Sequence, residues 1–478
     1  MSSYPPRRTL PHRFRLVRSS FLQHDGLPFA DVLSEDTIHN AFAEANADFG
    51  NEPGDVYTPA LTLWAFLSQV LCTGPLRSCT AAVARVITLL VASGKEACSD
   101  DTGAYCRARA KLPVPVLCRL STDVADGCEQ RLPQAWLWKG RHVYLADGST
   151  TSMPDTAANQ AEYPQAKTQK PGLGFPIARF VVLLSLATAM AKGMALGPYA
   201  GKETGETALL QALFECLSAG DVLLADRCYC SYFLIALLRE RGVDVVVRLH
   251  QRRRSDFRRG RRLGRGDHVV TWAKPARPEW MDEATYARMP ETLSIREVQV
   301  RVQQPGFRTE SLVVVTSLTE STDYTKDDLA ELYHERWLIE LDIRSIKVTL
   351  GMDVLRCRSP EMVRREMWAC LLAYNLIRQA LLEAALQGKC SPRQLSFTAA
   401  LQKIAAAWAL ASVCAATLLV QLIEVHLCDL AGQRIGTRPD RVEPRAVKRR
   451  PKPHKLLTKP RAEARAQLLA GVGRDKGR

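Results

Sequence analysis

The sequence predicts a mixed α/β protein, in which an α-helical N-terminal region precedes an α/β sheet domain that a β-rich segment interrupts. The first 135 residues hold helix starts and helix breakers. Short apolar runs then alternate with helical segments up to about residue 250. A further helix with an apolar strip begins near Thr325. A chain of 478 residues is long enough for two or three domains.

Residues 1–135 are expected to form a helical N-terminal domain. Thr58-Pro59 is a helix start, because a hydroxyl cap precedes proline at the first helical position. Gly74-Pro75 then ends this helix, and a later helix near residues 102–112 carries Arg107, Arg109 and Lys111. This basic group favours contact with DNA, although a plain helical bundle that supports the next domain is the alternative.

The sheet domain is expected in two parts, residues 136–250 and 313–430, and the second part includes the C-terminal helices. Val143–Ala146 is a short apolar strand followed by Asp147, and Val222–Ala225 is another followed by Asp226. Residues 251–312 between the two parts are expected to be an all-β insertion. A long helix from Pro360 to Leu386, stopped at Gly388, is expected to close the core.

Tyr333, Arg336, Glu340 and Lys347 give the sequence its most informative pattern. In an α-helix their spacing places all four in one stripe, about 21 Å long at about 1.5 Å rise per residue. An apolar strip beside it is expected to face the core, and it consists of Leu332, Ile339, Ile343, Ile346 and Leu350. A solvated helix with ion pairs is the alternative. The neighbouring strip favours a cleft instead.

The spacing Tyr-x2-Arg-x3-Glu-x6-Lys resembles the signature of transposases of the insertion-sequence-four family. The resemblance covers about residues 55–400, and its other matching stretches are Tyr57-Thr58-Pro59, Asp147-Gly148-Ser149 and Ala225-Asp226-Arg227. It implies a ribonuclease-H-like catalytic core in which Asp147, Asp226 and Glu340 form a DDE triad.

Three carboxylates of this kind suit divalent cations. Magnesium prefers oxygen ligands, and three carboxylates can hold two Mg²⁺ ions, for which Mn²⁺ would substitute. A lone aspartate at a strand end is weak evidence, because Asp-Gly is also a common turn. The competing acids Asp155, Asp221, Asp244 and Asp353 rank lower, because they do not match the motif positions of the family.

The remaining side chains of the stripe are expected to bind DNA. Arg336 can grip a phosphate with two hydrogen bonds, and Lys347 supplies a point charge. Tyr333 can donate a hydrogen bond to a phosphate oxygen. Trp337 either stacks on a base or packs. The family also implies an aromatic residue of the insertion that supports a flipped base, for which Trp272 is the candidate.

Two segments are especially rich in basic residues. The run from residue 252 to 265 is either a solvated loop or a contact with the DNA backbone, and the second is favoured. Its first arginines are Arg252, Arg253, Arg254, Arg258 and Arg259. The segment 431–478 has 15 Lys plus Arg and 4 Asp plus Glu, so it accounts for +11 of the net charge of +15. It is expected to be disordered, and it either binds nucleic acid or only aids non-specific association.

Other features exclude several classes of protein. The 14 cysteines include no Cys-x2-Cys pair, so no zinc site is indicated. No secretory signal is visible, which favours a reducing cytoplasm. The resemblance implies that this cytoplasm is bacterial and that the protein associates with the nucleoid. The uncharged segment from Ile404 to Ile423 is expected to be a packed helix and not a membrane span, because it is rich in alanine and holds polar residues.

The resemblance implies a cut-and-paste DNA transposase that binds the inverted-repeat ends of its element, cleaves them and joins the 3′-ends to target double-stranded DNA. It also implies a homodimer in a paired-end complex, and a hairpin intermediate is an open possibility. Two alternatives remain, a metal-dependent nuclease without strand transfer and a non-catalytic DNA-binding protein descended from a transposase.

Overall fold

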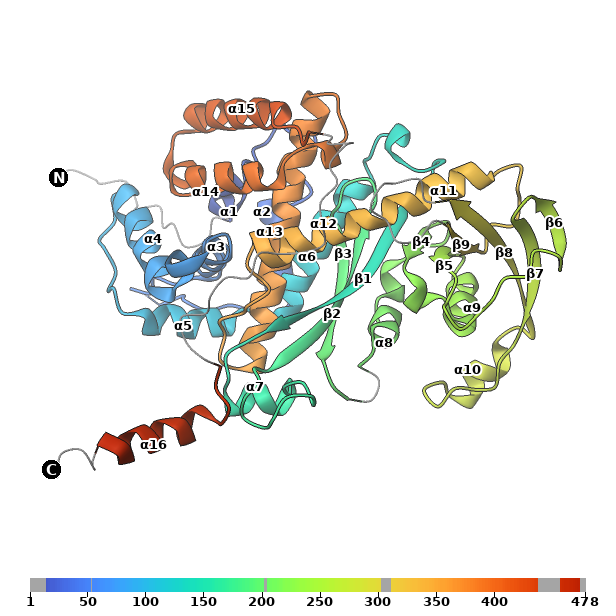
Figure 1. Ribbon diagram of the computed structural model, residues 1–478. Coiled ribbons are helices and arrows are strands. Elements are labelled where there is room, and N and C mark those ends of the chain that lie inside the picture. Colours follow the sequence, from blue (N-terminus) through green and yellow to red (C-terminus); the bar gives the residue numbers. More distant parts are fainter. Residues whose placement is uncertain (1–13, 53, 202–203, 302–310, 437–455, 473–478) are drawn as a thin grey trace, which may run out of the picture.

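The computed structural model describes residues 14–52, 54–201, 204–301, 311–436 and 456–472. Its strands are β1 (Val143–Ser152), β2 (Ile177–Ser185), β3 (Ala191–Pro198), β4 (Val222–Ala225), β5 (Asp244–Arg248), β6 (Arg261–Gly264), β7 (Asp267–Ala273), β8 (Thr292–Arg301) and β9 (Ser311–Thr316). They form one sheet in the order β3-β2-β1-β4-β5-β9-β8-β7-β6 (Figure 1). The mixed α/β class that the sequence predicts is therefore confirmed.

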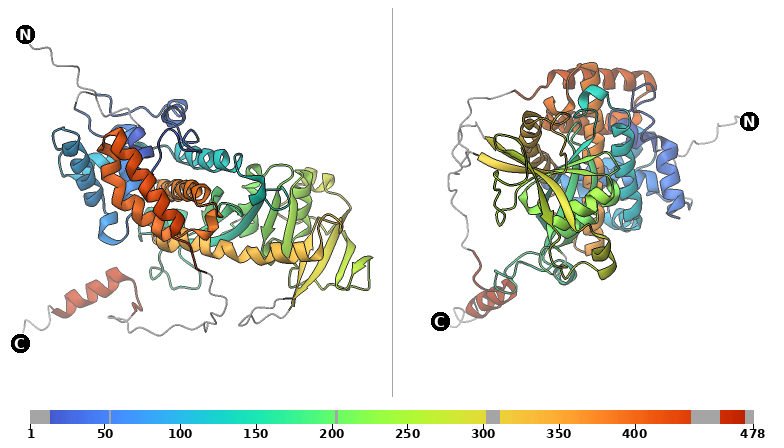
Figure 2. Two further views of the ribbon diagram at one scale, coloured as in Figure 1. Left: turned by 90° about the horizontal axis from the view of Figure 1, so that it is seen from above. Right: turned by 90° about the vertical axis from the view of Figure 1, so that its right-hand side faces the viewer.

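The helices flank this sheet and form a separate helical layer at its β3 end (Figures 1 and 2). They are α1 (Arg15–Ser20), α2 (Glu35–Glu44), α3 (Pro59–Val70), α4 (Cys79–Ala92), α5 (Thr102–Lys111), α6 (Val114–Glu129), α7 (Ala157–Glu162), α8 (Glu206–Gln211), α9 (Tyr232–Glu240), α10 (Glu283–Arg288), α11 (Lys326–His334), α12 (Leu338–Arg344), α13 (Pro360–Gln387), α14 (Phe397–Val413), α15 (Ala416–Gly432) and α16 (Arg461–Val472).

Parallel pairing is confined to the middle of the sheet. Strand β4 runs parallel to both β1 and β5, and the other neighbouring strands are antiparallel. The predicted insertion contributes β6, β7 and β8, which extend the same sheet beyond β9. It also contains helix α10, so the prediction that it is all-β was wrong. Asp282 caps this helix by accepting a hydrogen bond from the backbone N–H of Thr285, a local signal that the strand pattern concealed.

Each face of the sheet packs against a different core. In β1, Val143 and Leu145 belong to the large core shared with the helical layer, whereas Tyr144 and Ala146 belong to the core beneath α8 and α9. This alternation follows from the two-residue period of a strand. It also fixes which face each later residue of β1 points to.

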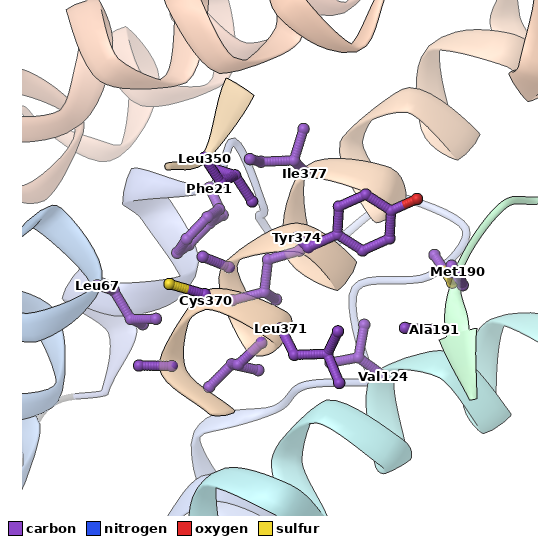
Figure 3. Packing of buried hydrophobic residues seen from close by; sticks show 14 of the residues in the cluster. Phe21, Leu67, Val124, Met190, Ala191, Leu350, Cys370, Leu371, Tyr374 and Ile377 are labelled. Carbon is purple, nitrogen blue, oxygen red and sulfur yellow. The ribbon is translucent and has the colours of Figure 1, made fainter. Parts of the chain in front are cut away.

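Helix α13 forms the centre of the helical layer. Its side chains Cys370, Leu371 and Tyr374 pack among residues from distant parts of the chain, including Phe21 and Val124 (Figure 3). By length and composition α13 is the described helix that would be able to cross a membrane, but 94% of its most apolar window is buried inside the protein. Its expected stop at Gly388 is confirmed.

Helix starts follow their capping residues closely. Thr58 accepts a hydrogen bond from Leu61 N–H at the start of α3, and Thr325 forms a capping box with Asp328 at the start of α11. Ser391-Pro392, a hydroxyl residue before proline, begins only a short 3-10 turn, because Leu395 is extended. Helix α14 begins after a second cap, Ser396.

The C-terminal expectations need two corrections. The tail predicted to be disordered contains helix α16, whereas residues 437–455 and 473–478 lie outside the described residues. The uncharged segment from Ile404 to Ile423 was expected to be one packed helix, but it does not form a single helix. It divides between α14 and α15, which are separated at Cys414 and Ala415.

Candidate active site

Asp147 and Asp226 lie side by side on neighbouring parallel strands. Ala146 of β1 pairs with Ala225 of β4. Asp147 directly follows Ala146 in the sequence, and Asp226 directly follows Ala225. Ala146 and Ala225 face the core beneath α8 and α9, so by alternation the two aspartates project toward the opposite face, which holds the large core and is covered by α12. Asp147 lies inside β1 and not at its end, because β1 continues along β2 as far as Ser152.

Burial raises the pKa of the Asp147 carboxyl to about 6. The backbone N–H of Gly148, which donates to Oδ1 at 2.8 Å, opposes this rise, and so does the nearby charge of Arg336. The charges of Glu206 and Asp226 raise the pKa further. Asp147 therefore lies within electrostatic reach of one arginine and two acids from different elements.

The segment that carries the four-residue signature is helical but not a uniform α-helix. Helix α11 ends at His334, a 3-10 turn covers Glu335–Trp337, α12 follows, and a π-helical turn covers Ser345–Thr349. The stripe calculated at 100° per residue is therefore approximate, because a 3-10 turn overwinds the chain and a π turn underwinds it. The predicted core-facing strip is confirmed, since Leu332, Ile339, Ile343, Ile346 and Leu350 are all buried.

Glu340 projects away from this buried strip. Its side chain is 63% exposed, and its Oε1 accepts a hydrogen bond of 3.0 Å from Nη2 of Arg336. Two residues later, Asp342 is buried and forms ion pairs with Arg378 and Arg393, at 2.9 Å and 3.0 Å. Asp342 thus fixes α12 to the helical layer, while Glu340 remains available at the surface.

In the part of the chain that the structure describes, no group of three or more His, Cys, Asp or Glu side chains is arranged to hold a metal ion. Asp147 and Asp226 offer the oxygen atoms that Mg²⁺ prefers, and they fit that ion as a pair. Glu340 is held by Arg336 instead. The three-carboxylate site therefore remains a prediction, and it requires the Glu340 side chain to leave this arginine.

The other signature residues differ in exposure. Tyr333 is 7% exposed, and burial raises the pKa of its phenol. Arg336 is mostly buried beside it. Trp337 is 41% exposed, and Nζ of Lys347 donates to Oγ of Ser149, two residues after Asp147, at 2.9 Å. Of these four side chains Trp337 is thus exposed, Arg336 and Lys347 are half-buried, and Tyr333 is buried.

The aromatic residue chosen from the insertion is not suited to stacking on a base. Trp272 is buried, its Nε1 donates to Oε1 of Glu297 at 3.1 Å, and the guanidinium of Arg253 covers its ring at 3.9 Å. This corrects the expected role of Trp272. Trp280, which the sequence pattern did not single out, is 44% exposed and lines a cavity of about 910 Å³ together with Arg252.

The arginines of the basic run divide into two groups. Arg253 packs on Trp272, whereas Arg252 and Arg254 are exposed. The side chains of Arg258 and Arg259 are 96% and 84% exposed, with only distant ion pairs to Asp256. The exposed arginines of this run can therefore contact a polyanion such as the DNA backbone.

The three basic residues on α5 also differ in exposure, because one of them is packed inside the protein and two are exposed. Nη1 of Arg109 donates to Oε1 of Gln69 at 2.8 Å, and its guanidinium lies 5.1 Å from the centre of the Phe66 ring. This corrects the expectation that Arg109 faces DNA, because it packs inside the helical domain. Arg107 and Lys111 are exposed.

Sequence reasoning missed Glu206, the first residue of α8. Its carboxyl group lies against Gly148, so that a Cβ added to this glycine would come within 2.6–2.8 Å of Glu206 Cδ and Oε1. The thiol of Cys228 donates to Glu206 Oε2 at 3.8 Å. No pattern in the sequence connects Glu206 to Asp147, because the two meet only when α8 packs against the sheet.

Residues 138–376, half of the chain, match the family model described as the transposase DDE domain. The chain belongs to the DDE transposase family. It is 28% identical over 359 residues to the transposase InsG of insertion sequence element IS4 from Escherichia coli strain K12, which covers 73% of this chain and 76% of the relative. The resemblance to the insertion-sequence-four family is thus confirmed, and the protein is a DNA-cleaving and strand-transferring enzyme.

Two further matches are more limited. The putative transposase InsL of element IS186A from the same organism is 38% identical over 66 residues, which is 14% of this chain and 18% of the relative. Among solved structures, a piggyBac transposase synaptic complex with hairpin DNA is 11% identical with a TM-score of 0.41, and the match covers 92% of this chain and 91% of that one.

Proposed function

We propose that this transposase moves an insertion sequence by a cut-and-paste reaction, in which it cleaves the inverted-repeat ends and joins the 3′-ends to target double-stranded DNA. The observation that carries the proposal is the adjacency of Asp147 and Asp226 beneath the helix that holds Glu340. In this proposal β1 to β5 and β9 form a ribonuclease-H-like core. The helices of residues 1–135 recognise the element ends, and the enzyme works as a homodimer in a paired-end complex near the bacterial nucleoid.

DDE transposases use divalent metal ions, and we assign the cation site of this one to Asp147, Asp226 and Glu340. Mg²⁺ is the proposed ion, in two copies, with Mn²⁺ as a substitute. When bound, such ions would activate the attacking water or 3′-hydroxyl and stabilise the leaving oxygen. The raised pKa of Asp147, about 6, means that this carboxylate must lose its proton before it can bind a cation.

Arg336 connects DNA binding to this site. Its guanidinium is mostly buried and donates a hydrogen bond to Glu340. If a DNA phosphate accepted the hydrogen bonds of Arg336 instead, the Glu340 carboxylate would lose its partner. The freed carboxylate would then turn toward the two aspartates, whose negative charges only a cation can offset. Under this proposal the site becomes complete when DNA and cation are both present.

The DNA backbone is proposed to follow the cationic and aromatic side chains around this site. Lys347 and Trp337 lie on the signature helix, and Arg258 and Arg259 lie on the loop between β5 and β6. Trp280, beside Arg252 in the large cavity, is the aromatic residue of the insertion that we propose to meet an unpaired base.

The function is tested with linear DNA that carries both ends of the element, a circular target plasmid and Mg²⁺. We expect cleavage at both ends followed by covalent joining of the 3′-ends to the plasmid, and no product when a chelator removes the cation. Cleavage without joined product under conditions where 3′-hydroxyl ends accumulate would favour the nuclease. DNA binding without any cleavage would favour the non-catalytic protein.

Arg258→Gln and Arg259→Gln are each expected to weaken DNA binding at every sequence and to reduce the salt dependence of binding. Each lost phosphate contact removes about one unit from the slope of log K against log salt concentration. Titrations at several salt concentrations measure this slope. Arg241→Gln, at the end of α9 and paired with Glu215, is the control and should leave it unchanged. Equal slopes for all three variants would remove this loop from the DNA path.

A further inference from the structure

The signature segment, residues 326–350, contacts three parts of the protein in succession. At its start, Nζ of Lys326 donates to the carbonyl of Arg265, in the turn between β6 and β7, at 2.8 Å. Further along, Nζ of Lys347 donates to a serine hydroxyl of β1 at 2.9 Å. At its end, the carbonyl of Leu350 accepts a hydrogen bond from an arginine in the turn between α3 and α4. The segment therefore extends from the β-rich insertion, past β1, to the helical layer (Figures 1 and 2).

The length of this segment sets a scale for DNA. Residues 326 and 340 are 14 positions apart, which is about 21 Å of helix at about 1.5 Å per residue. Duplex DNA rises about 3.4 Å per base pair, so about six base pairs span the same length. A duplex that runs along the segment and is cut near Glu340 therefore has one arm toward the helical layer and the other toward the insertion.

The insertion presents an arginine-rich surface at its end of the segment. Between residues 252 and 265 seven of the eight arginines are exposed, and Arg253 alone is partly buried. Asp256 is the one acid in this stretch, and its ion pairs are long, at 3.4 Å and 3.9 Å. Positive charge therefore dominates here. The arginine surface consists of Arg252, Arg254, Arg258, Arg259, Arg261, Arg262 and Arg265.

Buried side chains hold the loop that carries part of this surface. His268 of β7 and Glu297 of β8 are 0% and 5% exposed. Nδ1 of His268 donates to the carbonyl of Arg259 at 2.7 Å, and Oε2 of Glu297 accepts a hydrogen bond from the Ser255 hydroxyl. The ring of Phe257 packs on His268, with 4.6 Å between the ring centres. The backbone of the arginine surface is thus fixed before DNA binds, which lowers the entropy cost of binding.

We infer that the arginine surface binds the flanking donor DNA, which is the duplex outside the element that is joined to its end before cleavage. The inference rests on the proposed function, in which the helices of residues 1–135 recognise the element end. A duplex that is held there and cut beside Asp147 and Asp226 has only its flank left to meet the insertion. The flank is covalently joined to the end, whereas target DNA is not. Its sequence is arbitrary, which suits arginines that contact phosphates and not bases.

The test compares two duplexes with the same element end, one precleaved at the element boundary and one with a flank of about 15 base pairs, roughly twice the calculated span. Binding to the full chain is measured without a divalent cation, so that neither duplex is cut. We expect the flanked duplex to bind on the order of tenfold more tightly, a gain that appears once the flank exceeds about six base pairs. The double variant Arg261→Gln/Arg262→Gln should lose most of this gain and bind the precleaved end as the parent protein does.

The salt dependence supplies a second readout. In the double variant the slope of log K against log salt concentration should fall by about two units for the flanked duplex and stay unchanged for the precleaved end. Arg288→Gln is the matched control, because this arginine of α10 also lies in the insertion and is exposed, but pairs with Glu240. It should keep the full gain. Circular dichroism and the thermal unfolding midpoint verify that each variant is folded.

The outcomes separate this inference from the proposed function. If the parent protein cleaves the flanked end with Mg²⁺ and the double variant keeps the full gain, the flank site is refuted and the function stands. Equal weakening for both duplexes would assign the arginine surface to the element end. A defect confined to the joining of precleaved ends would assign it to target DNA, and either result overturns the inference. Absence of cleavage by the parent protein would overturn the proposed function and the inference with it.

Discussion

Asp226→Asn is expected to reduce DNA-end cleavage by about 10³-fold or more, which corresponds to about 4 kcal/mol of activation free energy. The amide keeps the shape of the side chain but removes the charge that would hold a cation beside Asp147. Asp226 follows a buried strand and precedes the short turn Arg227–Tyr229 in an extended conformation, without a side-chain capping hydrogen bond, and asparagine is compatible with that backbone. The expected loss is therefore one of chemistry and not of folding.

The measurement is the rate of single-turnover cleavage of an end fragment with Mg²⁺, together with the affinity for the same fragment. Affinity should stay within about threefold of the parent protein, because cationic side chains supply most of the binding. Asp155→Asn is the control, since this exposed acid bonds only to Gln160 among the described side chains. Cleavage by Asp226→Asn within tenfold of the parent would remove Asp226 from the catalytic site.

Asp342→Ala is expected to lower the free energy of unfolding by about 3–5 kcal/mol. This carboxylate is 3% exposed and pairs with Arg378 and Arg393, whose side chains are only 6% and 13% exposed. Its removal leaves two guanidinium groups poorly compensated in the interior. It also releases α12 from α13, so the position of Glu340 should become less defined.

Glu340→Ala is the matched comparison, two residues away on the same helix. The Glu340 carboxylate of its ion pair with Arg336 is exposed to solvent. The free energy of unfolding should therefore change by less than about 1 kcal/mol. Urea unfolding followed by tryptophan fluorescence measures both variants. The two acids should thus show opposite defects, with catalysis lost in Glu340→Ala and stability lost in Asp342→Ala. Similar unfolding midpoints for the two variants would contradict this division.

Local signals predicted much of the fold. The cap Thr58, the helix start near Thr325, the stop at Gly388 and the apolar strip of the signature helix depend on residues close together in the chain, and all four are as expected. Helix α10 was missed because a six-residue helix gives too short a periodicity. Its capping aspartate was the one available signal.

The site was predictable only where it coincides with a motif. Asp147 and Asp226 are adjacent because β1 and β4 pair in parallel, a contact between residues 79 positions apart that no local pattern encodes. The roles of Trp272 and Arg109 were mistaken for the same reason. Their partners Glu297 and Gln69 come from other elements and hold both side chains inside the protein. Glu206 was overlooked because only the packing of α8 brings it to Gly148.

The central claim is that three carboxylates converge on divalent cations when a DNA end binds. A structure of the enzyme with an element end and Mn²⁺, in which anomalous scattering locates the ions, tests it most directly. We predict ions at about 2.1 Å from carboxylate oxygens of Asp147, Asp226 and Glu340, with Arg336 moved from Glu340 to a phosphate. Ions bound elsewhere, or a Glu340 still paired with Arg336 beside a bound end, would contradict the account.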